Sequence, residues 1–268
     1  MHKRPVAREA TFLTLALLSG GLPGSAVQAQ SRPPVVLDIE KLRPVTAVSR
    51  FPSRVPTADV LIVGGGMGGV AAADALARAG RTVILSEPTR MLGGQLSTPA
   101  VPVPDENSYI ERTPGVGTRT YRELREALRA RYAAMPGIQP GREKNVGMCW
   151  VSRVSGEPQV WESVVRDRLK PYQERGLIRE VLTRHQLARV QRFAHNGRYH
   201  FADLVNLDDG RMVRVAAQYL LDASELGDGL ALAGSPWVVG QEARSEHNEP
   251  SAPSEAQHEF VQSFTYCF

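Results

Sequence analysis

The sequence predicts an α/β fold whose first unit is a parallel strand–helix–strand. Asp59–Val63 is rich in β-branched and aliphatic residues, which is typical of a buried parallel strand. An alanine-rich stretch follows and predicts a helix that runs to Ala79, with Gly80 where a helix-capping glycine belongs. A second strand, Thr82–Ser86, then ends at the acidic Glu87. This order is that of a Rossmann-like βαβ unit.

The first strand and the helix are joined by a G-x-G-x-x-G motif whose glycines are Gly64, Gly66 and Gly69. Gly64 permits a tight turn, Gly66 lets a diphosphate approach the backbone, and Gly69 lets the helix pack close to the sheet. The diphosphate would lie at the helix N-terminus, so Met67 and Gly68 belong to the same predicted contact set. The motif therefore predicts a dinucleotide site, with an ordinary glycine-rich turn as the alternative.

Glu87 stands where a ribose-binding acid is expected. It follows Gly64 by 23 residues (87 − 64), close to the roughly 20 residues that separate the motif from the acid in dinucleotide-binding folds. A carboxylate accepts hydrogen bonds from the ribose hydroxyls and repels a 2′-phosphate. NADP is therefore disfavoured as the ligand of this unit.

An Arg-x-x-Gly-Gly element follows Glu87 and resembles the flavoprotein signature of the glutathione-reductase-like FAD superfamily. The resemblance implies that this segment runs beside the phosphates of FAD. An arginine there adds a charge-assisted contact, and paired glycines let the main chain pass close to the cofactor. A surface loop whose glycines serve a turn is the alternative. The cofactor-binding residues predicted here are Pro88, Arg90, Gly93, Gly94 and Gln95.

A second part of the resemblance lies in Tyr219–Asp228, which looks like the strand and turn that return the chain to the FAD domain, with Ala223 and Ser224 beside the cofactor. With Trp150–Arg153 and Trp237–Gly240 it makes residues 59–268 similar to the bacterial FAD-dependent oxidoreductase family, some of whose members carry the label xanthan lyase. The resemblance implies a non-covalent FAD and a redox reaction, and it leaves the substrate open.

Loops and two helices are predicted between the βαβ unit and residue 176. Pro99–Gly117 is expected to be irregular, and Thr118–Ala133 has apolar residues at helical spacing. A second helix opens at Glu157 or Pro158, ends or kinks at Pro171, and stops by Gly176. Its buried stripe is predicted to consist of Val160, Trp161, Val164, Val165 and Leu169.

After Gly176 the pattern becomes that of β-structure, with hairpin turn signals at Asn196-Gly197 and Asp209-Gly210. We expect a three-stranded antiparallel meander and then one further strand. In the resembled fold the meander passes the adenine, and a main-chain group near Val190 is the predicted contact. The predicted strands are Ile178–Leu182, Gln186–Phe193, Tyr199–Leu204, Met212–Val215 and Gln218–Asp222.

The N-terminus predicts a secretory signal peptide over residues 1–29 and hence a periplasmic or extracellular protein. A positive start precedes the apolar run Thr11–Leu18, and small residues favour cleavage between Ala29 and Gln30. The apolar run is shorter than the ~20 residues of a membrane-spanning helix. Removal of this segment changes the net charge from +4 to +2 (4 − 3 + 1), which gives no argument for nucleic acid. Residues 30–58 are predicted to be a linker or an extended arm.

The predicted reaction is hydride transfer from a small-molecule substrate to FAD. The chain ends on the apolar Phe264–Phe268, and we expect it to be the N-terminal portion of such an enzyme. A catalytically inactive flavin-binding protein is one alternative, and a polysaccharide lyase is a weaker one. No catalytic residue is assigned, because Gln95, Ser97 and Thr98 can face the flavin or serve the loop alone.

Cysteine and histidine spacing gives no metal site. Pairing of Cys149 with Cys267 stays open, as do the oligomeric state and the electron acceptor.

Overall fold

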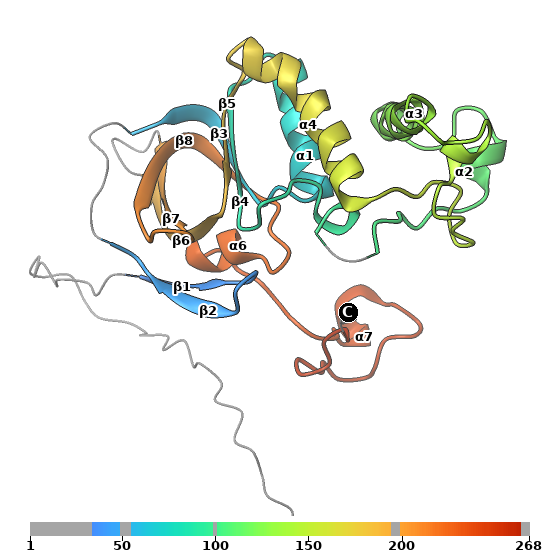
Figure 1. Cartoon of the computed structure of the whole chain (residues 1–268). Helices are drawn as coiled ribbons and strands as arrows, with labels where there is room; N and C mark the ends of the chain where they lie inside the picture. The colour runs from blue at the N-terminus through green and yellow to red at the C-terminus, as the bar shows by residue number, and fades with distance from the viewer. Residues whose placement is uncertain (1–33, 49–54, 99–100, 194–198, 264–268) are drawn as a thin grey trace, which may run out of the picture. The chain divides into compact units, whose positions relative to one another are not determined.

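The computed structural model describes residues 34–48, 55–98, 101–193 and 199–263 (Figure 1). The predicted signal peptide, the Asn196-Gly197 turn and Cys267 lie outside these residues. All elements named below belong to the unit formed by residues 33–268. Its short elements are α2 (Tyr109–Arg112), α6 (Asp228–Leu232), α7 (Arg244–His247) and the 3-10 helices η1 (Gly94–Leu96) and η2 (Arg142–Lys144).

A six-stranded sheet with the order β5-β4-β3-β8-β7-β6 is the centre of this unit. Four of its strands are parallel neighbours: β5 (Ile178–Thr183), β4 (Val83–Glu87), β3 (Thr57–Val63) and the end of β8 (Met212–Asp222). Helix α1 (Met67–Arg78) connects β3 to β4, with Ala79 as its C-cap and Gly80 left-handed at φ +77°. The α/β fold and its first βαβ unit are confirmed.

The rest of the sheet is an antiparallel meander of β6 (His185–Phe193), β7 (Tyr199–Asn206) and the first part of β8. Two strands were predicted over Met212–Val215 and Gln218–Asp222, and that division was wrong, because β8 is continuous. Only Ala216 and Ala217 separate the two stretches, and both fit within the sheet, at 5% and 1% exposure. One strand therefore pairs with β7 at its start and with β3 at its end.

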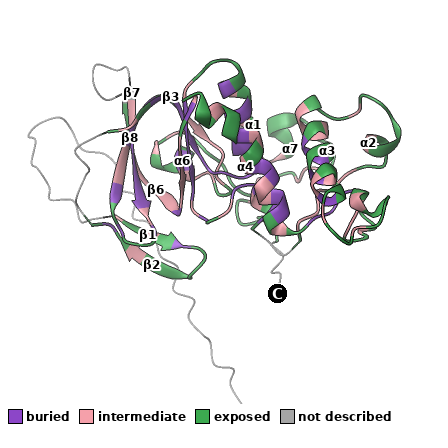
Figure 2. Ribbon diagram, turned by 45° about the horizontal axis from the view of Figure 1, so that its top comes forward, coloured by how far each residue is buried: buried purple, intermediate pink, exposed green. Residues whose placement is uncertain are grey.

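The two faces of the parallel strands are covered by different layers. Val60 and Ile62 of β3 pack into the core of the helical layer, whereas Leu61 and Val63 pack into the core of the meander. This alternation follows from the two-residue period of a strand. Figure 2 shows the buried residues along the central strands and on α1 and α4 (Pro158–Glu174).

Helix α4 has the predicted buried stripe, from Val160 to Leu169. It continues through Pro171 to Glu174, and Gly176 follows in a left-handed conformation with φ +69°. Helix α3 (Arg119–Ala133) packs against α4, and the Thr118 side chain caps its N-terminus. No helix in the described part of the chain has the length and apolar character needed to cross a membrane.

A β-hairpin lies within residues 30–58, the predicted linker or arm. Its strands are β1 (Val35–Asp38) and β2 (Arg43–Thr46). An apolar cluster of Val36, Val45 and Ala47 packs against the meander residues Val205 and Met212. The hairpin is thus held on the meander by an apolar contact.

Candidate cofactor site

The glycine turn between β3 and α1 is too crowded for side chains at two positions. Gly64 has φ +102°, and a Cβ there would lie 2.2 Å from the carbonyl oxygen of Ala223. A Cβ on Gly69 would lie 1.9 Å from the carbonyl oxygen of Gly64. Since both obstacles are backbone atoms, neither can turn aside. These two glycines therefore have the backbone roles that the motif predicts.

The start of helix α1 offers free donors. Gly66 is its N-cap, with no side-chain cap hydrogen bond, and the first turn contains no acidic residue. The N–H groups of this turn are therefore open to an anion. A Cβ on Gly66 would lie 2.9 Å from Oε1 of the exposed Glu225 side chain and 3.9 Å from Gly94 Cα, and a Cβ on Gly68 would have no atom within 4 Å. The residues here fit the diphosphate of a dinucleotide.

The Glu87 carboxylate points at the glycine turn. Its Oε2 accepts a hydrogen bond from the N–H of Gly65, and its Oε1 accepts one from the N–H of Thr89, both at 2.8 Å. The residue is only 7% exposed. Each carboxylate oxygen can accept a second hydrogen bond. The acid is therefore oriented by the backbone and still has capacity for two ribose hydroxyls.

The paired glycines bring their segment against the same turn. The N–H of Gly93 donates to the carbonyl oxygen of Gly65 at 2.8 Å. Gly93 and Gly94 have φ of +108° and +52°, and a Cβ on Gly94 would lie 2.9 Å from Gly66 Cα. Gln95 follows with its side chain exposed. The structure thus brings together residues 64–69, 87 and 93–95.

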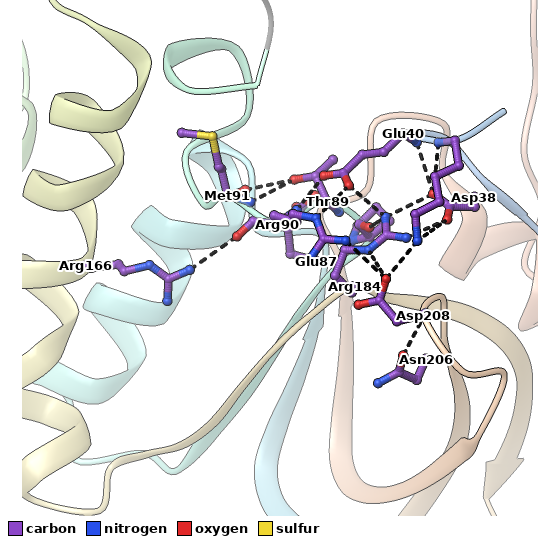
Figure 3. Close-up of polar contacts among 12 residues, drawn as sticks. Asp38, Glu40, Glu87, Thr89, Arg90, Met91, Arg166, Arg184, Asn206 and Asp208 are labelled. Atoms are coloured by element: carbon purple, nitrogen blue, oxygen red, sulfur yellow. Dashed lines mark hydrogen bonds and ion pairs between the residues drawn. The ribbon is translucent and has the colours of Figure 1, made fainter.

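The Arg90 side chain is engaged by two acidic residues. It is 58% exposed and forms ion pairs with Glu40, at 3.4 Å, and with Asp208, at 3.2 Å (Figure 3). The adjacent Pro88 contributes its carbonyl oxygen to Arg184 at 3.3 Å. The phosphate contact of Arg90 stays a prediction, and the side chain forms ion pairs with two carboxylates.

Ala223 and Ser224 lie at the end of β8, beside the glycine turn. The N–H of Ala223 donates to the carbonyl oxygen of Val63 at 2.8 Å. Asp222 then accepts hydrogen bonds from the N–H and Oγ of Ser224, at 3.0 and 2.7 Å, and from the N–H of Leu230 at 2.8 Å. Sequence reasoning missed Asp222 as the organiser of this turn, although an Asp two residues before a Ser is an Asx-turn signal.

Val190 lies in the middle of β6, opposite Ala202, and packs against the core of the meander. The residue of this region that reaches the segment after Glu87 is Arg184, whose N–H donates to the carbonyl oxygen of Thr89 at 3.0 Å. Arg184 has φ +60° and joins β5 directly to β6. Its sequence surroundings carry no spacing that marks it.

Three residues were considered for catalysis, namely Gln95, Ser97 and Thr98, and they differ in burial. Ser97 is 2% exposed and donates to the carbonyl oxygen of Leu92 at 2.6 Å, so it serves the loop. Gln95 and Thr98 are exposed. In the ranges that the structure describes, no group of three His, Cys, Asp or Glu residues is arranged to hold a metal ion.

Comparison with known proteins decides the family. The model of the family described as FAD dependent oxidoreductase matches residues 59–267. The chain belongs to the FAD-dependent oxidoreductase family. FAD is therefore its cofactor, as the Arg-x-x-Gly-Gly resemblance implied. The match begins at Asp59, so the hairpin β1–β2 lies outside it.

Individual relatives match only parts of their own length. An all-trans-retinol 13,14-reductase from Macaca fascicularis is 39% identical over 87 residues, which cover 31% of this chain and 14% of that protein. A flavin-dependent monooxygenase, solved in complex with FAD and substrate, is 20% identical and has a TM-score of 0.40. The match covers 70% of this chain and 34% of the monooxygenase chain. A flavoprotein/dehydrogenase from Cytophaga hutchinsonii is 15% identical and also has a TM-score of 0.40. That match covers 66% of this chain and 42% of the dehydrogenase chain.

Proposed function

We propose that this chain holds FAD for an oxidoreductase that removes a hydride from a small-molecule substrate. The observation that carries the proposal is the glycine turn, whose uncapped helix start and inward-facing Glu87 suit a diphosphate and a ribose. When bound, FAD supplies the hydride acceptor. The curated relative is covered over only 14% of its length, so activity and substrate class are part of the proposal.

The chain's own residues bind and orient. The first N–H groups of α1 hold the diphosphate, and Glu87 accepts hydrogen bonds from the ribose. Gly93 and Gly94 let the main chain pass close to the cofactor, since the nearest atom to a Cβ on Gly94 is Gly66 Cα at 2.9 Å. The turn from Ala223 to Ser224 lies against Gly64, where a Cβ would be 2.2 Å from the carbonyl oxygen of Ala223.

A flavin-binding protein without turnover is the second candidate. It is favoured by the hydrogen bond from Ser97 to the Leu92 carbonyl, which engages the one buried hydroxyl among the three residues considered for catalysis. Addition of candidate substrates without oxygen separates the two. Bleaching of the flavin absorbance indicates an enzyme, and an unchanged spectrum with every substrate class indicates a carrier.

The direct test of FAD binding is Gly66→Val with Gly68→Ala as its matched control. A Cβ at residue 66 meets the flexible end of Glu225 at 2.9 Å and Gly94 Cα at the ordinary contact distance of 3.9 Å, so the fold should survive while the diphosphate is excluded. We expect Gly66→Val to be purified without flavin absorbance and with a near-normal melting temperature. Gly68→Ala adds a side chain at the same helix start and should retain the melting temperature, because no protein atom lies within 4 Å of its Cβ. Normal flavin loading in Gly66→Val would show that the cofactor lies elsewhere.

We also propose that the protein is exported with loss of residues 1–29. The support is the sequence pattern alone: a positive start, a short apolar run and small residues before Gln30. The intact mass of the protein recovered from the periplasm or medium should correspond to a chain that begins at Gln30. A chain that still begins at Met1, retained inside the cell, would refute this proposal.

A further inference from the structure

Charged side chains connect the hairpin β1–β2 to the segment that follows Glu87 (Figure 3). At the centre, Arg184 contacts Asp38 through two parallel hydrogen bonds, Nη1 to Oδ1 at 2.9 Å and Nη2 to Oδ2 at 2.5 Å. Arg184 also lies 3.1 Å from Glu40 and 3.3 Å from Asp208. Arg90 is paired with the same Glu40 and Asp208. Asp38, Glu40 and Asp208 therefore form ion pairs with the two arginines, Arg184 and Arg90.

The Asp38–Arg184 pair is buried, with side chains that are 0% and 4% exposed. Hydrogen bonding from Arg184 lowers the pKa of Asp38 to about 2, so the acid is charged at every ordinary pH. Taking two charges out of water is unfavourable, and a buried pair is weak evidence for a role in stability alone. Its geometry is the more informative feature, because a bidentate arginine–carboxylate contact fixes orientation.

The orientation that it fixes is that of residues 88–90. The backbone of Arg184 holds the carbonyl oxygen of Thr89, at 3.0 Å, and its side chain holds that of Pro88, at 3.3 Å. Glu40 accepts the N–H of Arg90 at 2.8 Å. The remaining N–H, that of Thr89, donates to Oε1 of Glu87. A continuous path of hydrogen bonds therefore runs from the hairpin to the acid that faces the glycine turn.

We propose that the hairpin β1–β2 is part of the FAD site, and that Asp38 and Glu40 are positioning residues. Through Arg184 and Arg90 they hold Thr89, and Thr89 holds the Glu87 carboxylate in the orientation that the ribose requires. The inference rests on the proposed function of Glu87. It assigns a role to residues 34–48, which lie outside the family match at 59–267.

The structure supplies a matched control for this role. Asp203 and Arg214 form a second bidentate pair, at 2.7 and 2.9 Å, with the Asp203 side chain 3% exposed. This pair joins β7 to β8, where Asp203 and Arg214 are direct register partners. Asp203→Asn therefore measures how far the loss of a buried ion pair lowers stability and FAD affinity in general. Asp38→Asn should show this general loss and, in addition, the loss of FAD affinity caused by a misplaced Glu87 carboxylate.

The experiment compares the FAD affinity and melting temperature of the two variants, by titration of flavin-free protein with FAD. We expect Asp38→Asn to weaken FAD binding at least tenfold and Asp203→Asn to change it less than twofold, while both lower the melting temperature. Equal FAD affinities in the two variants would overturn the inference. Failure of the unsubstituted protein to bind FAD would instead overturn the proposed function.

A second measurement separates positioning from general stability. If Asp38 acts through Glu87, Asp38→Asn should weaken FAD binding less than twofold in a Glu87→Gln background, because the two effects are coupled. The same loss in both backgrounds would overturn the inference. If Asp38→Asn does not fold, Glu40→Gln replaces it, since the Glu40 side chain is 27% exposed, against 0% for Asp38, and the hairpin keeps its apolar contact with Val205 and Met212.

Discussion

Gly69 and Gly68 are neighbours in the first turn of α1, yet alanine should have opposite effects at the two positions. A Cβ on Gly69 would lie 1.9 Å from the carbonyl oxygen of Gly64, whereas ordinary contacts of a Cβ begin at 3.4 Å. A Cβ on Gly68 has no atom within 4 Å. Gly69→Ala must therefore move backbone against backbone, and Gly68→Ala places a methyl group in open space.

The required movement is about 1.5 Å (3.4 − 1.9). Strain of this kind in a packed interior destabilises a protein by roughly 1–3 kcal/mol or more. A hydrogen bond to the cofactor that lengthens by this distance is lost. One hydrogen bond to a charged group contributes about 1.5–3 kcal/mol, which corresponds to a roughly 10- to 150-fold change in affinity. Gly68→Ala should be neutral or slightly stabilising, since alanine favours a helix by about 1 kcal/mol over glycine.

The assay is urea unfolding of the flavin-free proteins together with titration by FAD. We expect Gly69→Ala to lose stability and to bind FAD at least tenfold more weakly, while Gly68→Ala retains the stability of the unsubstituted flavin-free protein. The outcome that would refute the reasoning is normal stability and normal FAD affinity in Gly69→Ala. That result would mean that helix α1 does not approach the strand as closely as the structure places it.

Two further predictions concern stability. Trp161 is fully buried and donates its Nε1–H to the carbonyl oxygen of Pro102 at 2.9 Å, so Trp161→Ala should destabilise the protein by about 3–5 kcal/mol in urea unfolding. A loss below 1 kcal/mol would contradict this packing. The pKa of Asp38 falls from 3.8 to about 2 on folding, so its contribution to stability is present above pH 4 and is lost as the pH falls towards 2. Acid unfolding followed by circular dichroism should therefore show a smaller loss of stability over this interval in Asp38→Asn, and an unchanged pH dependence would contradict the assignment.

The features that the sequence predicts correctly depend on near neighbours. The glycine turn, the end of α1 at Gly80 and the buried stripe of α4 each follow from spacing within one strand or a few helical turns. Even the direction of Glu87 is of this kind, because a carboxylate at the end of the second strand of a βαβ unit lies beside the turn after the first. Local chemistry was sufficient for these.

The features that it could not predict depend on distant partners. Asp38 and Arg184 are 146 residues apart, and Arg90 and Asp208 are 118 residues apart. No periodicity relates such positions, so the ion pairs of Arg90 with Glu40 and Asp208 could not be predicted from the sequence. In the same way, β8 is continuous because β7 pairs with its first part and β3 with its last part, and β3 is distant in the sequence.

The position of β3 in the sheet has a consequence for biosynthesis. Its neighbour β8 pairs Asp222 with Val63, a separation of 159 residues (222 − 63). The ribosome adds roughly 5–20 residues per second, so synthesis of Asp222 follows that of Val63 by about 8–30 s. Until then the edge of β3 that pairs with β8 has no partner strand. During that interval the backbone N–H and C=O groups along this edge are unpaired, and such an edge is open to pairing with another chain.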